Sequence, residues 1–168
     1  MICCLDVDYN NAAQGQCAAV LFHHWADTEP AAIRHAVTGD IAPYRPGAFY
    51  KRELPCMLNT LQKIEENIDT LVIDGYVWLG ENRGGLGVHL YEALGRKIPV
   101  IGVAKSVFRG TETVAVSVLR GKSKNPLWIT AIGVDVQDAG RWVEQMAGAY
   151  RLPDMIKRAD AECRDWPD

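Results

Sequence analysis

Three carboxylates lie within or beside apolar segments that are expected to be buried. Asp6 interrupts an apolar run near the start, Asp74 ends the apolar run "TLVID", and Glu53 opens a stretch with helical patterning. Burying an unpaired carboxylate is costly. Carboxylate oxygens drawn together from three elements are hard ligands suited to Mg²⁺ or Mn²⁺, and a divalent ion would neutralise their mutual repulsion. The three acids therefore predict a divalent-metal site.

Two further residues are candidates for the same site. Asp8 lies two residues after Asp6, on the same face of a strand, and is a possible fourth ligand. Lys105, in "GVAKS", follows an apolar strand and is suited to holding a phosphate oxygen or orienting an attacking water. Taken singly, each has an ordinary alternative, as a solvated acid, a capping acid or a surface lysine.

The first forty residues have the pattern of a strand meander. Apolar and β-branched segments at 1–9, 16–25 and 31–37 alternate with turn-forming residues, so three antiparallel strands are expected. The period then changes, and apolar residues at helical spacing predict a helix from about 48 to 66. We expect Pro55 to be tolerated there because it lies in the first turn.

Strands and helices alternate through the rest of the chain. Strands are expected at 70–74, 98–106, 113–121 and 127–133, and helices at 86–95, at 136–150 and after Pro153; residues 76–85 are expected to form a loop. This order predicts an α/β fold, with an antiparallel meander followed by parallel strands in a mixed sheet flanked by helices. A ribonuclease H-like layout has this order, as do several other α/β folds.

Composition narrows the class of protein. The chain has 168 residues, 48% of them hydrophobic, which suits a single domain over residues 1–168. We expect a cytoplasmic protein with no membrane partner, since neither a membrane span nor a signal-peptide pattern is recognisable. The five cysteines have neither paired nor zinc-like spacing, so reduced buried thiols are expected.

Charge is unevenly distributed along the chain. The formal net charge is −3, yet residues 83–125 carry eight Lys or Arg against two acidic residues. A basic segment inside an acidic chain is compatible with a nucleic-acid partner, and equally with a solvated surface that is basic by chance.

Four motifs together are similar to those of the endonuclease V family. They are "PYRPGAFYKRE", "LVIDG", "LGVHL" and "IPVIGVAKS", and their order agrees with the family over roughly residues 1 to 160. The resemblance implies a short, divergent member with a ribonuclease H-like fold. It also implies an Mg²⁺-dependent endonuclease, with Mn²⁺ as a substitute, that acts in DNA repair. Such an enzyme cuts the second phosphodiester bond 3′ to inosine, leaving 3′-hydroxyl and 5′-phosphate ends.

The resemblance also assigns roles to residues. Asp6, Glu53 and Asp74 match the catalytic, metal-binding carboxylates, and Lys105 matches the lysine beside the scissile phosphate. Tyr44 matches a wedge tyrosine that fills the gap left by a flipped base. Pro46 and Gly47 are expected to form the turn that presents this tyrosine, and Gly47, Phe49 and Gly75 to line the base pocket. Arg52 is expected at the phosphates, and Arg83 is a further residue expected to contact nucleic acid.

Two segments depart from the family pattern. The loop "YVWLGENRGG" lacks the usual His-Pro-Arg-Arg stretch, and Trp78 is a candidate for a different stacking surface. Val134 and Asp135 stand where the family has His-Arg near the metal site, and Asp135 is either a further metal ligand or a helix cap.

These departures leave two alternatives open. One is a metal-dependent nuclease of the same fold acting on another lesion, branched DNA or RNA. The other is an inactive nucleic-acid-binding protein. DNA is expected over RNA, and the chain is expected to be a monomer.

Overall fold

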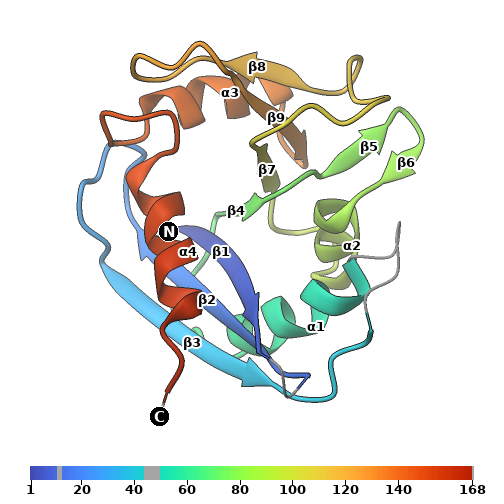
Figure 1. Cartoon of the computed structure of the whole chain (residues 1–168), viewed down its shortest axis with the longest axis vertical. Coiled ribbons are helices and arrows are strands. Elements are labelled where there is room, and N and C mark those ends of the chain that lie inside the picture. Colours follow the sequence, from blue (N-terminus) through green and yellow to red (C-terminus); the bar gives the residue numbers. More distant parts are fainter. Residues whose placement is uncertain (11–12, 44–49, 168) are drawn as a thin grey trace.

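The computed structural model describes residues 1–10, 13–43 and 50–167. Figure 1 shows a central sheet with helices on both of its faces. The strands are β1 (Ile2–Tyr9), β2 (Gly15–Phe22), β3 (Ala32–Thr38), β4 (Thr70–Asp74), β5 (Trp78–Gly80), β6 (Arg83–Gly84), β7 (Val100–Ala104), β8 (Val116–Val118) and β9 (Leu127–Ile132). The helices are α1 (Tyr50–Leu61), α2 (Leu86–Ala93), α3 (Val136–Gln145) and α4 (Asp154–Arg164).

Seven strands form the main sheet in the order β3-β2-β1-β4-β7-β9-β8. The predicted meander is confirmed, because β1 pairs antiparallel with β2, and β2 with β3. β4 and β7 then extend the sheet in parallel with β1. β9 and β8 join antiparallel, so the expected run of parallel strands ends at β7. The mixed α/β class is confirmed, and the order is that of a ribonuclease H-like fold.

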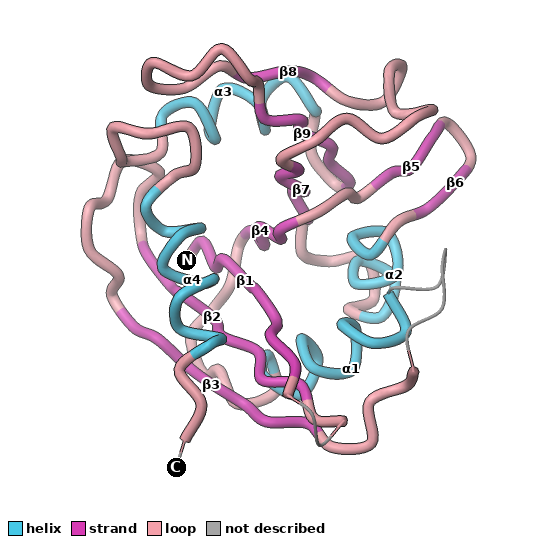
Figure 2. Tube along the Cα trace, viewed as in Figure 1, coloured by secondary structure: helices cyan, strands magenta, loops and turns pink. Residues whose placement is uncertain are grey.

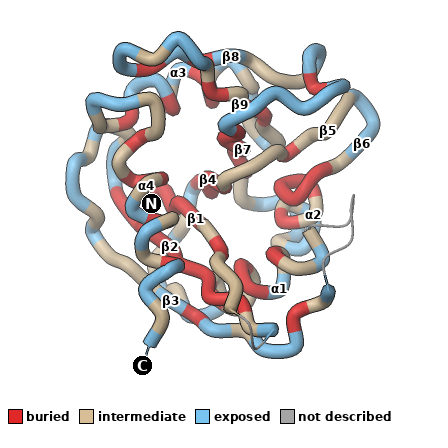
Figure 3. Tube along the Cα trace, in the orientation of Figure 1, coloured by how far each residue is buried: buried red, intermediate tan, exposed pale blue. Residues whose placement is uncertain are grey.

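Side chains alternate between the two faces of the sheet, and the buried residues form two clusters, one on each face. Figure 3 shows buried residues along the central strands β1, β2, β4 and β7. Ile2, Cys4 and Val72 belong to a cluster with residues of α3 and α4. Cys3 and Leu5 belong to a second cluster with residues of α1 and α2. Figure 2 shows α4 lying across β1 and β2. Strands β1 and β4 are therefore packed on both faces.

Helix α1 differs from its expected length. It ends at Leu61 rather than near residue 66, and Pro55 lies inside it instead of in its first turn. The proline is tolerated because it is exposed, so the carbonyl of Lys51 that its missing N–H would have bonded can reach water. The buried stripe of α1 is Glu53, Cys56, Met57 and Thr60, which places an acid on its inward face.

The segment at 76–85 is not a plain loop. Strands β5 and β6 pair antiparallel in a small second sheet, with the register Trp78↔Gly84. This hairpin projects from the end of β4 beside α2 (Figure 1). All five cysteines are free and buried. In the part of the chain that the structure describes, no helix has the length and apolar character needed to span a bilayer.

Candidate active site

Asp6 and Asp74 lie side by side toward the carboxyl ends of the neighbouring central strands β1 and β4. β1 and β4 are parallel with Leu5 opposite Ile73, which brings the next residue of each strand into the same row. Burial and the charge of Asp74 raise the pKa of Asp6 from 3.8 to about 7. The predicted convergence of these two acids is thus present in the structure.

Glu53 approaches the same pair from α1. Its residue is 6% exposed, and no hydrogen bond from a described residue reaches its carboxylate. Burial raises its pKa well above the usual value, and the charges of Asp6 and Asp74 add to the shift. An acid so deeply buried, with no donor among the described residues, is poised to interact with a cation.

Lys105 is the cation that meets this cluster. It directly follows β7, which runs parallel to β4, and its Nζ lies 2.5 Å from Asp74 Oδ2. Burial opposes its charge, but the hydrogen bond and the charge of Asp74 outweigh that effect and raise the pKa of Lys105. The side chain of Arg151 donates to the backbone carbonyl of Lys105 and, at 2.8 Å, to that of Pro126, which ties the lysine to a neighbouring loop.

Asp160 is a fourth acid at this edge, and sequence reasoning missed it. It lies on α4, and its negative charge raises the pKa values of Asp6 and Lys105. Its Oδ1 accepts a hydrogen bond from Arg164 at 2.7 Å. The sequence did contain a sign of its position, because Asp160 adjoins the apolar stripe of α4 that packs on the sheet. This stripe includes Ile156, Ala159 and Cys163. An acid flanking such a stripe faces β1 rather than solvent alone.

The donor set fits a hard divalent ion by its chemistry, since every member is a carboxylate. Across the described residues, however, no three His, Cys, Asp or Glu side chains are arranged so that they could hold a metal ion together. Lys105 is paired with Asp74 in this arrangement.

The other two possible ligands have different partners. Asp8 Oδ2 accepts a hydrogen bond from Trp166 Nε1 at 2.8 Å, which anchors the C-terminal segment to β1. Asp135 is the N-cap of α3, and its Oδ1 accepts from the backbone N–H of Gln137 at 2.8 Å. Capping is therefore the observed role of Asp135.

Val134 and Asp135, which were expected near the metal site, lie at the opposite ends of the strands from the carboxylates. β9 is antiparallel to β7, so its last residue, Ile132, pairs with Val100 at the start of β7. Lys105 follows the other end of β7. The segment after β9 thus lies across the sheet from the carboxylates, and the expectation that it is near the metal site is wrong.

A cavity of about 300 Å³ opens beside the carboxylates. Glu53, Asp74 and Gly75 line it together with Arg83 of the hairpin, as the assignment of Gly75 to a pocket predicts. Tyr50 forms another part of the wall, and its ring stacks on His89 at 3.7 Å between centroids.

Arg52 and Trp78 are not among the described residues that line this cavity. Tyr44, Pro46, Gly47 and Phe49 lie outside the described residues. The Arg52 guanidinium lies over the Tyr9 ring, 4.3 Å from its centroid. Trp78 is anchored by a 3.0 Å hydrogen bond from its Nε1 to the Ala131 carbonyl, so it is a packing residue in this structure.

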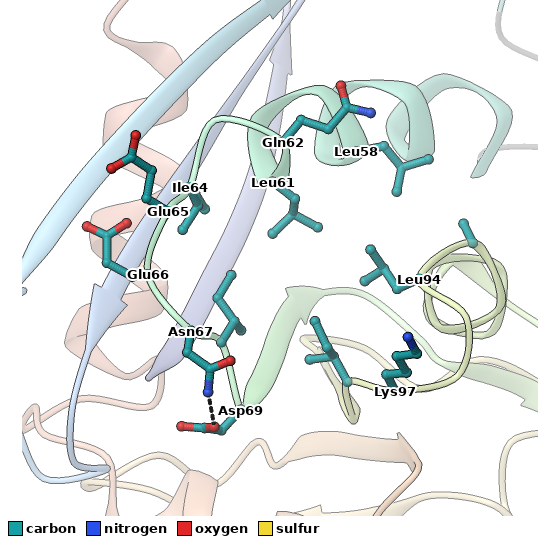
Figure 4. Close-up of a pocket in the computed structure, with 13 residues that line it drawn as sticks. Leu58, Leu61, Gln62, Ile64, Glu65, Glu66, Asn67, Asp69, Leu94 and Lys97 are labelled. Atoms are coloured by element: carbon teal, nitrogen blue, oxygen red, sulfur yellow. Dashed lines mark hydrogen bonds between the residues drawn. The ribbon is translucent and has the colours of Figure 1, made fainter.

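A larger cavity, of about 860 Å³, lies elsewhere on the molecule (Figure 4). It is bounded by the end of α1, by residues 62–69 and by the end of α2. Leu58, Leu61 and Leu94 point into it, with Glu65 and Lys97 near its rim. Asp69, which lines this cavity, directly precedes β4, whereas Asp74 ends that strand. The cavity therefore lies at the opposite end of β4 from Asp74. None of the predicted site residues that the structure describes lines it.

The chain is similar to known proteins over most of its length. The family model for endonuclease V matches residues 1–161. The chain is 30% identical over 163 residues to an endonuclease V of Rhodospirillum centenum, covering 84% of this chain and 67% of that protein.

Solved structures agree with the sequence match. The crystal structure of endonuclease V from Streptomyces avermitilis superposes with a TM-score of 0.82 at 28% identity, covering 97% of this chain and 79% of that one. Endonuclease V from Ciona intestinalis, in complex with a 24mer DNA containing an inosine followed by a ribo-adenosine, has the same fold at 19% identity. Its TM-score is 0.80, with 97% of this chain and 84% of that one covered. The chain belongs to the endonuclease V family and is a nuclease.

Proposed function

We propose that this chain is an Mg²⁺-dependent endonuclease that hydrolyses a phosphodiester bond 3′ to inosine in nucleic acid, as a DNA-repair enzyme. The observation that carries the proposal is the pair of neighbouring acids Asp6 and Asp74. Their charges act on Glu53, and Lys105 forms an ion pair with Asp74. Family membership supports the nuclease activity. The complex of the Ciona relative with inosine-containing DNA supports the substrate.

The residues that would hold Mg²⁺ are Asp6 and Asp74, with Glu53 and Asp160 beside them. When bound, a divalent ion supplies Lewis-acid activation of water and of the phosphate. Because the described acids are not preassembled as three ligands, their side chains would have to move to hold the ion, and Asp74 would have to leave the Lys105 ammonium.

Each residue then has a definite task. Asp6 must be deprotonated to bind a cation, so its raised pKa makes loading more favourable above about pH 7. Once released from Asp74, Lys105 can donate to a phosphate oxygen and offset the charge that develops during cleavage. Glu53 and Asp74 also line the adjacent cavity, so a base held there would place its own backbone near the acids.

The test uses short end-labelled duplexes with Mg²⁺ or Mn²⁺: DNA that carries one inosine, one uracil or no lesion, and RNA with or without one inosine. Cleavage at the second phosphodiester bond 3′ to inosine is expected, with DNA cut faster than RNA. Cleavage that ignores inosine would instead favour a nuclease with a changed substrate, which the altered hairpin at 76–84 motivates. Binding without cleavage in either metal would favour an inactive binding protein.

A further inference from the structure

The cavity beside the carboxylates has two chemically different sides. Glu53 and Asp74 form the acidic side. Arg83, Tyr76 and Phe108 form the other, which comes from the hairpin and from the loop after β7. A volume of about 300 Å³ is at the small end for ligand sites, which suits a single base rather than a whole nucleotide.

The aromatic side is braced by hydrogen bonds. The Tyr76 hydroxyl donates to the Ser106 carbonyl at 2.7 Å and accepts from the Phe108 backbone N–H at 3.2 Å. Its polar capacity is therefore used in holding the loop. The rings of Tyr76 and Phe108 lie 6.3 Å apart and offer apolar faces to the cavity.

Arg83 has polar capacity to spare. Its guanidinium lies 5.5 Å from the centroid of the Phe108 ring, within the range of a cation–π contact. Among the described residues, no hydrogen bond or ion pair engages that guanidinium. The contact with Phe108 restrains the group at the cavity while leaving a planar fork of N–H donors available to a ligand.

We propose that Arg83 is a specificity-determining residue that reads the O6 and N7 acceptors of a 6-oxopurine in this cavity. An arginine fork matches two adjacent acceptors on one edge of a flat ring, and hypoxanthine and guanine share that edge. Adenine presents an amino donor where these bases have O6, so its edge opposes the guanidinium. The recognised class of base is the 6-oxopurines. This inference rests on the proposed function, which is what brings a base into the cavity.

The chain-specific prediction is that the cavity itself does not separate hypoxanthine from guanine. In single strands, where no base pair must open, inosine and guanosine should bind with similar affinity and adenosine more weakly. In duplexes, the weaker pairing of inosine would add its own preference.

The test is binding of fluorescent single-stranded oligonucleotides that are pyrimidine except for one inosine, guanosine or adenosine. Anisotropy is measured in EDTA, which separates recognition from metal-dependent cleavage. The variants are Arg83→Gln and, as a matched loss of one positive charge on an exposed residue outside the cavity lining, Arg109→Gln. A glutamine amide matches the N6 and N7 edge of adenine.

The expected result is a roughly tenfold fall in the inosine-to-adenosine affinity ratio in Arg83→Gln, with the ratio unchanged in Arg109→Gln. An equal loss for all three oligonucleotides would mean that Arg83 contacts phosphate, and it would overturn the inference. An unchanged ratio, or no preference in the wild type, would overturn it as well. Failure of the proposed function shows separately, as absence of inosine-dependent cleavage in metal.

Discussion

The ammonium of Lys105 lies 2.5 Å from Asp74 Oδ2, so the group best suited to a substrate phosphate is bonded to an acid suited to a metal ion. The two side chains come from adjacent parallel strands, and the lysine follows the strand end directly. A cation that takes Asp74 would free Lys105 for the phosphate. Such an exchange would connect metal binding with substrate binding.

Replacing Lys105 should separate these two steps. In Lys105→Met the competing ammonium is gone, so Asp74 should bind a divalent ion at least as tightly as in the wild type. Cleavage should fall by about a hundredfold or more, because a donor to the developing charge is lost. Calorimetric Mn²⁺ titration and single-turnover cleavage measure the two effects. Weaker metal binding in Lys105→Met would contradict the exchange.

The metal-free protein should lose stability as pH rises. Asp6 has a pKa of about 7 in the folded state against 3.8 for the free group, and the pKa of Glu53 is raised in the same direction. The folded state therefore holds protons that the unfolded state has released, and the stability contributed by Asp6 is full below about pH 4 and lost through about pH 7.

Thermal melts in EDTA across this pH range measure that loss. The melting temperature of the wild type should fall between mildly acidic and mildly alkaline pH, and Asp6→Asn should show a flatter profile because it cannot ionise. A wild-type melting temperature that rises through neutral pH in EDTA would show that the acids do not repel one another as described.

Divalent ions should restore the stability that the protein loses as the acids ionise. Ligand binding to the folded state alone stabilises by about 2.7 kcal/mol at a hundred times the dissociation constant. Mn²⁺ should therefore raise the wild-type melting temperature above pH 7, and Asp6→Asn should abolish most of that rise. Glu29→Gln, which changes an exposed acid far from β1 in sequence, is the control and should keep it. Equal shifts in all three proteins would exclude this cluster as the metal site.

Arg120 should matter for stability rather than for nucleic acid. Although it belongs to the basic segment at 83–125, it is 6% exposed. Its guanidinium donates to backbone carbonyls around the end of α3, among them Met146, Gly148 and, at 3.2 Å, Tyr150. These contacts satisfy carbonyls at the negative end of the helix.

Arg120→Ala should lower the free energy of unfolding by about 2 to 4 kcal/mol, since it leaves buried carbonyls unpaired. Urea denaturation measures this change. The exposed Lys122→Ala, two residues away, is the matched control and should be nearly neutral. Affinity for nucleic acid per folded molecule should be retained in Arg120→Ala, and its loss without loss of stability would reverse the assignment.

Sequence patterns predicted the scaffold well because its signals are local. The meander, the apolar runs ending at Asp74 and before Lys105, and the helical period after Glu53 are all properties of short segments. The placement of Val134 and Asp135 failed because the antiparallel direction of β9 is a long-range property of the sheet. Asp160 was missed for a similar reason, since only the packing of α4 on β1 brings it near Asp6.

The most direct test of the carboxylate site is cleavage of an inosine-containing DNA duplex by the wild type and by Asp74→Asn under identical Mg²⁺ conditions. We expect inosine-dependent cleavage by the wild type. In Asp74→Asn, a variant that still melts cooperatively, cleavage should be slower by about a hundredfold or more, because a residue that would hold the metal ion is lost. Cleavage by Asp74→Asn at the wild-type rate would contradict the assignment of the carboxylate cluster as the active site.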